Sequence, residues 1–284
     1  MIPANFAYER PKTVDDALSI LSGDPDAKIL SGGHSLLPLM KLRLVRPSRL
    51  VDISRVPELH RVEHHADRVV IGAAVKYHEI LADSKFGEIA PIMQQACAVI
   101  ADPQVRHRGT IGGSAVHADP ASDLAAVFLA ADVRFRVRGT DGERLVPVSD
   151  WYLGPLLSAL QSDEILMAVE FPRPLPARQA YVKFAHPASG YALAGAAALL
   201  DLRPNGRAHR VYVAVTGAAQ QPFRARQTES QLAGRELNST IIREAAALDA
   251  AAQEYPEDQL YPADWRRNLA GVMIVRALEK ALQN

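Results

Sequence analysis

Two glycine-containing segments carry the residues whose types and spacing could hold a ligand. The first, Ser31-Gly32-Gly33-His34-Ser35, joins an expected strand to an expected helix. Glycines let a backbone approach a ligand closely, and the unpaired amides at the start of a helix can donate hydrogen bonds to an anion. The segment therefore predicts a phosphate or pyrophosphate site. The alternative is a tight turn in which Ser35 serves only as an ordinary helix cap.

The second segment, Thr110-Ile111-Gly112-Gly113-Ser114, flanks a glycine pair with hydroxyl side chains, so its amides could line a phosphate or a ribityl chain. Further on, Asp119 is expected to cap a helix with Pro120 at the first helical position. Asp123 is either a partner of the helix dipole or an acceptor for ligand hydroxyls. Two such segments fit a long dinucleotide better than a small anion. Neither has a Gly-x-Gly-x-x-Gly or Walker pattern, which disfavours a Rossmann site and a P-loop.

Structural roles are expected for the other residues capable of chemistry. Cys97 lies in an apolar helix, where we expect it to be inert, and a single cysteine cannot hold an iron–sulfur cluster. His64-His65 has no accompanying carboxylates or cysteines and predicts a solvated loop rather than a metal site. Asp102 with Arg106-His107-Arg108 is either a catalytic cluster or, as we expect, a salt-bridged loop that supports the second glycine segment. We find no general acid–base pair suited to substrate chemistry.

The composition limits the class of protein. The 284 residues contain 32 Lys and Arg and 32 Asp and Glu, so the formal net charge is zero. That balance disfavours an electrostatic nucleic-acid binder and a polybasic membrane-surface protein. No apolar run approaches the ~18 residues of a membrane-spanning helix, and the first residues lack the features of a signal peptide. We therefore expect a globular, cytoplasmic protein.

Hydrophobic periodicity divides the chain into three stretches. Residues 1–54 alternate helix and strand, which indicates a small parallel sheet. Residues 55–176 mix strands with helices and end in a proline-rich linker, residues 172–176. Residues 177–284 predict three antiparallel strands followed by helices. The expected helices are residues 11–21, 36–44, 77–82, 89–100, 124–131, 225–232, 240–253 and 264–282, and the expected strands are residues 27–30, 50–53, 68–75, 133–137, 164–171, 180–184, 191–202 and 209–216.

The glycine segments resemble those of a known family. Residues 31–38, with Lys41, are similar to the first flavin loop of the FAD subunits of molybdenum hydroxylases. These are the medium subunits of aerobic carbon monoxide dehydrogenase and its relatives, and they resemble the FAD domain of xanthine dehydrogenase. Residues 110–114 and the Asp-Pro-x-x-Asp of residues 119–123 resemble the second flavin loop. Similarity extends to residues 2–11, 100–106 and 269–277, so it covers essentially the whole chain.

The resemblance implies an α+β fold. A two-lobed FAD-binding domain of the vanillyl-alcohol-oxidase/PCMH type would comprise residues 1–54 and 55–176. A C-terminal domain like that of carbon monoxide dehydrogenase flavoproteins, residues 177–284, would hold a three-stranded antiparallel sheet with a helical bundle. The resemblance also implies non-covalent FAD on this chain. Iron–sulfur clusters and molybdopterin would lie on a small and a large partner subunit, assembled as a dimer of heterotrimers.

The resemblance also assigns the flavin contacts to residues of this chain. Residues 28–36 would line the pyrophosphate, Ala101 would border the pocket, and Tyr191 would pack near the isoalloxazine ring. The expected cofactor-binding residues are Lys28, Ile29, Leu30, Ser31, Gly32, Gly33, His34, Ser35, Leu36, Ala101, Thr110, Gly113, Ser114, Asp123, Leu166, Lys183 and Tyr191. No catalytic or metal-ligating residue is implied, because the flavin would relay electrons from the partner's clusters to an external acceptor.

Several alternatives stay open at this stage. Residues 186–191, His-Pro-Ala-Ser-Gly-Tyr, stand where some relatives carry basic residues and Gly-Asp-Tyr, which leaves the electron acceptor open. In berberine-bridge-type oxidases a histidine placed like His34 is covalently bound to flavin, whereas in the family described above it is a non-covalent loop residue. The chain could also be a free-standing FAD-dependent oxidase, or a non-enzymatic scaffold that has lost FAD. The intact glycine segments argue against the scaffold.

Overall fold

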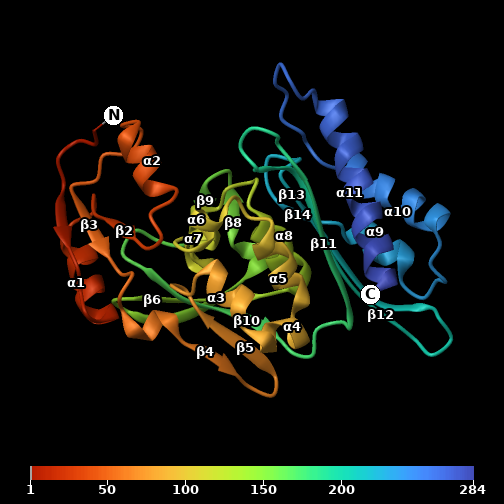
Figure 1. The fold of residues 1–284 in the computed structure, drawn as a ribbon, viewed down its shortest axis with the longest axis horizontal. Helices are drawn as coiled ribbons and strands as arrows, with labels where there is room; N and C mark the ends of the chain where they lie inside the picture. Colours follow the sequence, from red (N-terminus) through yellow and green to blue (C-terminus); the bar gives the residue numbers. More distant parts are fainter. Residues whose placement is uncertain (1) are drawn as a thin grey trace.

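The computed structural model describes residues 2–284, and its first part is a small lobe (Figure 1). The elements of this lobe are β1 (Ala7–Glu9), α1 (Val14–Gly23), β2 (Lys28–Leu30), α2 (Leu36–Lys41) and β3 (Arg49–Asp52). The strands form a parallel sheet with the order β1-β3-β2. The Thr13 side chain caps α1 by accepting a hydrogen bond from the Asp16 amide. The predicted parallel sheet is confirmed, and β1 is an additional strand.

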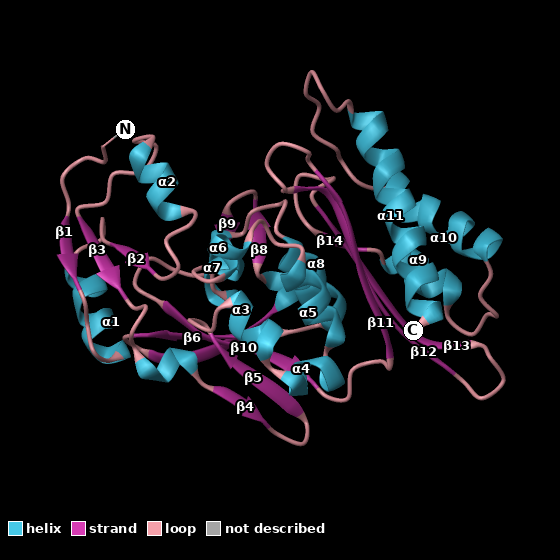
Figure 2. Ribbon diagram, in the orientation of Figure 1, coloured by secondary structure: helices cyan, strands magenta, loops and turns pink. Residues whose placement is uncertain are grey.

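The second lobe is built on a five-stranded antiparallel sheet with the order β4-β5-β10-β6-β7. One face of this sheet carries α5, α7 and α8 (Figure 2). In the core between them, Phe128 packs edge-on against Phe135 and Phe171, and Phe135 stacks on Trp151. The elements are η1 (Pro57–His60), β4 (Val62–His64), β5 (Arg68–Gly72), α3 (Tyr77–Ala82), α4 (Ser84–Ile89), α5 (Pro91–Ala98), α6 (Pro103–Arg106), α7 (Ile111–His117), α8 (Asp123–Ala131), β6 (Arg134–Gly139), β7 (Gly142–Pro147), η2 (Val148–Asp150), β8 (Tyr152–Gly154), β9 (Leu157–Ser158) and β10 (Ile165–Pro172).

The C-terminal part is a four-stranded antiparallel sheet covered by helices. Its elements are β11 (Arg178–Ala185), β12 (Ala192–Leu202), β13 (Ala208–Thr216), β14 (Phe223–Arg224), α9 (Arg226–Leu232), α10 (Ser239–Ala251) and α11 (Ala263–Gln283). Along β12, Ala198 and Leu200 pack toward these helices, whereas Ala197 and Leu199 join the core of the second lobe. The sheet therefore lies between α5 and α8 on one side and α9 to α11 on the other. The prediction of three strands is wrong by one, because the short β14 pairs with β13.

Several predicted elements differ from the structure, among them the helix expected over residues 89–100, which is interrupted at Ala90 between α4 and α5. The helix expected over residues 36–44 ends at Lys41. Asp119 and Pro120 form a turn, and α8 begins only at Asp123, so Asp119 is not a helix cap. Its side chain instead accepts a hydrogen bond from the amide two residues on, as Asp often does in turns. Residues 110–114 are the cap and first turn of α7 rather than a loop. Tyr191 precedes β12 instead of lying within it.

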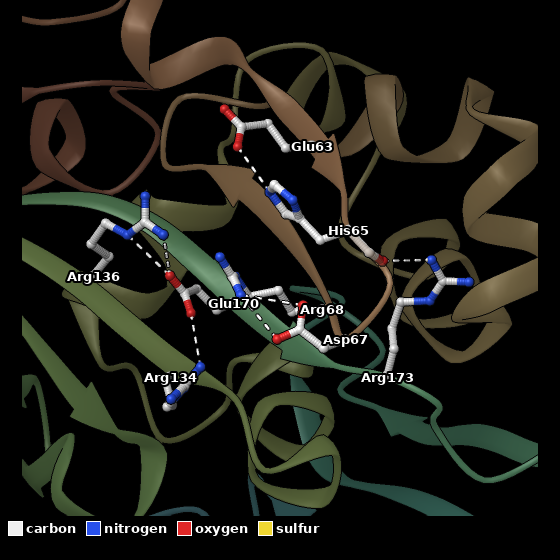
Figure 3. Close-up of polar contacts among 8 residues, drawn as sticks. All are labelled: Glu63, His65, Asp67, Arg68, Arg134, Arg136, Glu170 and Arg173. Atoms are coloured by element: carbon white, nitrogen blue, oxygen red, sulfur yellow. Dashed lines mark hydrogen bonds and ion pairs between the residues drawn. The ribbon is translucent and has the colours of Figure 1, made fainter.

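The outer face of the five-stranded sheet is charged (Figure 3). Residues of β6 alternate between the core and this face, so Arg134 and Arg136 point away from the helices. Both donate to Glu170 of β10, which is 3% exposed. Arg138 pairs with Asp15 of α1 at 2.5 Å, which ties the first lobe to this sheet. Within residues 2–284, no helix has the length and apolarity needed to cross a membrane.

Candidate functional site

The two glycine segments, far apart in the sequence, meet where the first lobe contacts the second. The Ser31 hydroxyl lies 3.1 Å from the Thr110 hydroxyl. A Cβ added at Gly32 would lie 2.5 Å from the carbonyl oxygen of Arg108. Glycine is therefore required at that position for the segments to approach each other. The structure brings together the two segments that the sequence predicts to share one ligand.

The first glycine segment presents a row of unused backbone donors. The amides of residues 32–36 have no acceptor within residues 2–284, and Gly33 has a φ of 79°, which L residues rarely adopt. Ser35 occupies the cap position of α2 but makes no side-chain capping hydrogen bond, so the interpretation of Ser35 as an ordinary cap is wrong. Consecutive unpaired amides at a strand–helix junction are well suited to a phosphate.

The second glycine segment has no such unused donors. The amides of residues 111–114 all donate within the protein, at 2.9–3.1 Å, to the carbonyls of residues 73 and 75 and to the main chain and side chain of Thr110. The expectation that this segment offers amides to a phosphate is therefore wrong. It offers instead the exposed backbone of Gly113 and the hydroxyl of Ser114, which lies 2.7 Å from the Ser122 hydroxyl.

Asp123 lies at the junction between the second lobe and the C-terminal sheet. It begins α8, is 6% exposed, and accepts hydrogen bonds from the Tyr181 hydroxyl at 2.6 Å and from Lys183 Nζ at 2.8 Å. Burial raises the pKa of the Asp123 carboxyl, while the Lys183 ammonium acts in the opposite direction. Lys183 Nζ also donates to the Val99 carbonyl at 3.0 Å. The partners of this carboxylate are thus residues of the C-terminal domain.

Ala101 and Tyr191 lie on loops that approach each other. Ala101 has a φ of 41°, and Arg106 Nη1 donates to its carbonyl at 3.1 Å. A Cβ added at Gly190 would lie 4.0 Å from Ala101 Cα. Tyr191 is 52% exposed, and its pKa is raised by burial and then by the charge of Asp119. A half-exposed phenol ring therefore stands beside the loop expected to border the pocket.

The remaining predicted contacts differ in their exposure. Lys28 is exposed at the start of β2, and Ile29, Leu30 and Leu36 are partly buried next to the first glycine segment. His34 is exposed within that segment. Leu166 of β10 is only 3% exposed and packs in the hydrophobic core of the second lobe. The structure therefore gathers most of the predicted residues around the Ser31–Thr110 contact and leaves Leu166 in the core.

The other candidate residues have structural roles. Asp102 caps α6 by accepting from the Val105 amide at 2.9 Å, and Arg106 donates to carbonyls. Within residues 2–284, Asp102 forms no ion pair with Arg106, so the expected salt bridge is wrong. Cys97 is buried, and burial raises the pKa of its thiol, which keeps it protonated and unreactive. The part of the chain that the structure describes contains no group of three side chains able to hold a metal ion.

Two residues that support the site, Tyr181 and Thr216, are not among those predicted from the sequence. Tyr181 and Lys183 are two residues apart on a strand, a spacing that places both on one face and could have indicated a shared partner. Thr216 Oγ1 donates to the carbonyls of Pro120 at 2.7 Å and Ser122 at 2.9 Å, which fixes the turn before α8. No local signal identifies Thr216, because the first of these partners is 96 residues away in the sequence.

The residues present fit a dinucleotide that carries a pyrophosphate and a flat ring. The amides of residues 32–36 can bind phosphate oxygens, and the hydroxyls of Ser31 and Ser114 can bind a polyol. The half-exposed ring of Tyr191 offers an aromatic surface. The buried Lys183 supplies a cation close by.

Comparison with known proteins identifies relatives along the whole chain. Residues 4–174 match the family of the FAD binding domain in molybdopterin dehydrogenase, and residues 179–281 match the CO dehydrogenase flavoprotein C-terminal domain. The carbon monoxide dehydrogenase medium chain of Hydrogenophaga pseudoflava is 35% identical over 283 residues, which cover 99% of this chain and 98% of that one.

Solved structures share the whole fold. A carbon monoxide dehydrogenase from Hydrogenophaga pseudoflava superposes with a TM-score of 0.95 at 36% identity, over 100% of this chain and 99% of the other. Quinoline 2-oxidoreductase from Pseudomonas putida 86 superposes with a TM-score of 0.94 at 31% identity, again over 100% and 99%.

Proposed function

This chain belongs to the family of FAD-binding subunits of molybdenum-containing dehydrogenases, and on that premise we propose that it binds one FAD non-covalently and relays electrons from a partner subunit to an external acceptor. The observation that carries the proposal is the row of unpaired amides at residues 32–36 beside the Ser31–Thr110 contact. Backbone donors in such a row are suited to a pyrophosphate. The chain is accordingly an oxidoreductase subunit.

Each segment of the proposed site has its own task. The first glycine segment binds the pyrophosphate through backbone amides and needs no side chain to do so. The exposed His34 therefore need not form a covalent bond to the flavin. The second segment meets the ribityl chain through the Ser114 hydroxyl and the bare backbone of Gly113. Lys183 would provide a buried positive charge, and Tyr191 would offer its half-exposed aromatic ring to the flavin.

FAD, when bound, accepts and releases electrons either singly or in pairs, which is the chemistry that the subunit needs. The protein would hold and orient the cofactor. The single cysteine of the chain cannot hold an iron–sulfur cluster, which requires about four thiolates. The clusters that deliver electrons are therefore proposed to lie on a small partner subunit.

The substrate is proposed to react on a large molybdopterin subunit rather than on this chain. The two structural neighbours described above are named for carbon monoxide and for quinoline, although both superpose on the full length of this chain. Similar flavin subunits thus occur in enzymes with different substrates. We propose that the complex is a dimer of heterotrimers in which this chain is the medium subunit.

The test is acid precipitation of the purified, yellow protein. We expect FAD in equimolar amount in the supernatant and a colourless pellet. A yellow pellet that becomes colourless in His34→Ala would contradict the non-covalent assignment. A native protein that stays colourless when FAD is added would contradict the site itself and support the scaffold alternative.

A further inference from the structure

The strand β11 presents a polar face to the second lobe. Its residues alternate, so Ala180 and Val182 pack toward the C-terminal helices while Tyr181 and Lys183 face the second lobe. Tyr181 is 3% exposed and the Lys183 side chain 5% exposed. A charged side chain so deeply buried must be matched by a specific partner. Asp123, 7% exposed at its side chain, is that partner.

The Asp123 carboxylate is held from two sides. Lys183 donates to one oxygen at 2.8 Å, and Tyr181 donates to the other at 2.6 Å. The Lys183 ammonium has three N–H groups. Two of them have acceptors, Asp123 and the Val99 carbonyl, and within residues 2–284 the third has none. Asp123 directly follows Ser122, whose hydroxyl lies 2.7 Å from that of Ser114, so the Asp123–Lys183 pair lies beside the second glycine segment.

We propose that Tyr181 is a positioning residue for the flavin site, which holds Asp123 so that the Lys183 ammonium keeps one donor directed at the cofactor. The inference rests on the proposed function and adds a division of roles within it. Lys183 contacts the cofactor, Asp123 orients Lys183, and Tyr181 orients Asp123. The C-terminal domain therefore contributes a charge to a cofactor held mainly by the FAD-binding domain.

The environment of this group supports a fixed orientation. Burial and then the charge of Asp123 raise the pKa of the Tyr181 hydroxyl well above its ordinary value, so the phenol remains a donor. Gly195 lies on the neighbouring strand, and any Cβ there would collide with the Tyr181 hydroxyl. Glycine at position 195 therefore leaves the space that the Tyr181 hydroxyl occupies while it donates to Asp123.

A double-mutant cycle on the full-length protein tests the proposal. Tyr181→Phe, Lys183→Met and the double variant are titrated with FAD, and the midpoint potential of the bound flavin is measured. Tyr181→Phe should bind FAD about tenfold more weakly, the order expected when a hydrogen bond to a charged group is lost. Its flavin potential should fall, because a well-placed cation favours the reduced, more negative form. In the Lys183→Met background, Tyr181→Phe should change neither quantity further.

The matched control is Tyr255→Phe, which removes a buried hydroxyl that donates to Ala250 at 2.8 Å among the C-terminal helices. It should lower stability without changing FAD affinity or potential. Wild-type affinity and potential in Tyr181→Phe, or losses that simply add in the double variant, would overturn the positioning role. If Tyr181→Phe does not fold, Asp123→Asn takes its place in the same cycle with the same expectation. Failure of the wild-type protein to bind FAD would instead refute the proposed function.

Discussion

Gly112 and Gly113 are adjacent, yet the structure gives them different tasks. A Cβ at Gly112 would lie 2.5 Å from the Ala73 Cβ in the interior. Gly113 is exposed, and a Cβ there would meet only Thr110 Oγ1, at 2.8 Å. That hydroxyl both caps α7 and contacts Ser31. The first glycine therefore serves packing, and the second serves the junction of the two glycine segments.

We predict opposite phenotypes for the two alanine variants. Gly112→Ala should lower the free energy of unfolding by about 1–3 kcal/mol, as overpacking does, while the folded fraction keeps its FAD affinity. Gly113→Ala should weaken FAD binding about tenfold, because displacing the Thr110 hydroxyl disturbs a hydrogen bond at the site. The weakened α7 cap costs about 0.5–2 kcal/mol, which the gain of about 1 kcal/mol from alanine in a helix largely offsets, so the net change in stability should be small. Chemical denaturation and flavin fluorescence titration measure the two effects. Gly23→Ala, where nothing lies within 4 Å of the added Cβ, is the control.

The sequence predicts that both glycine segments bind the ligand. It does not predict which of their backbone amides remain unpaired in the folded protein and free to bind a phosphate. The amides of Ile111 and Gly112 donate to the carbonyls of Val75 and Ala73, more than 30 residues away in the sequence. Pairing of that kind depends on tertiary contacts that leave no local pattern. Asp119 is similar: Asp-Pro is typical of both a turn and a helix start, and packing of the turn against Thr216 favours the turn.

Among the strands, the charged outer face of the five-stranded sheet stabilises the pairing of β10 with β6. Glu170 lies opposite Arg134 in the register and also accepts from Arg136 (Figure 3). We predict that Glu170→Gln lowers the free energy of unfolding by about 1–3 kcal/mol, the loss expected when charge-assisted hydrogen bonds to a buried group are weakened. FAD affinity should not change. Glu143→Gln on exposed β7 is the control, and equal destabilisation by both would contradict the assignment.

The ion pair between Glu164 and Arg144 predicts acid sensitivity. Hydrogen bonds from Arg144, at 2.7 Å, lower the pKa of Glu164 below its ordinary value of 4.5. Because the folded-state pKa is the lower one, this carboxylate contributes its full stabilisation above about pH 4.5, and the contribution is lost as the pH falls through the folded-state pKa. Glu164→Gln should flatten the decline in unfolding free energy below that pH. Urea denaturation at a series of pH values measures this decline. If the unfolding free energy of Glu164→Gln fell with pH as steeply as that of the wild type, the prediction would be contradicted.

The elements found from the sequence are those with long periodic patterns. The three C-terminal helices and β11 to β13 lie within a few residues of their expected positions. The strands β1, β4, β7, β8, β9 and β14 were not anticipated. Most of these have only two or three residues, too few for a period-2 pattern to show. Their strand geometry comes from pairing with a neighbour, so only the folded sheet defines them.

In the whole molecule, the C-terminal sheet is packed on both faces. Residues on one side join the core of the second lobe, and residues on the other join the core of the C-terminal helices. The pairing of Asp123 with Tyr181 and Lys183 lies in this interface. The C-terminal domain therefore contacts a predicted flavin-site residue, Asp123, directly.

The last prediction separates an electron-relay subunit from a free-standing oxidase. The chain expressed alone should bind FAD, because the amides of residues 32–36 belong to one polypeptide. It should not oxidise the substrate of the complex, since one cysteine cannot hold a cluster. Adding the iron–sulfur and molybdopterin subunits should restore turnover of the substrate. The same addition to the Gly113→Ala variant should not restore turnover when the FAD concentration is too low to saturate its weakened site. Full turnover by the isolated chain, free of iron and molybdenum, would show that substrate reacts over the flavin of this chain itself.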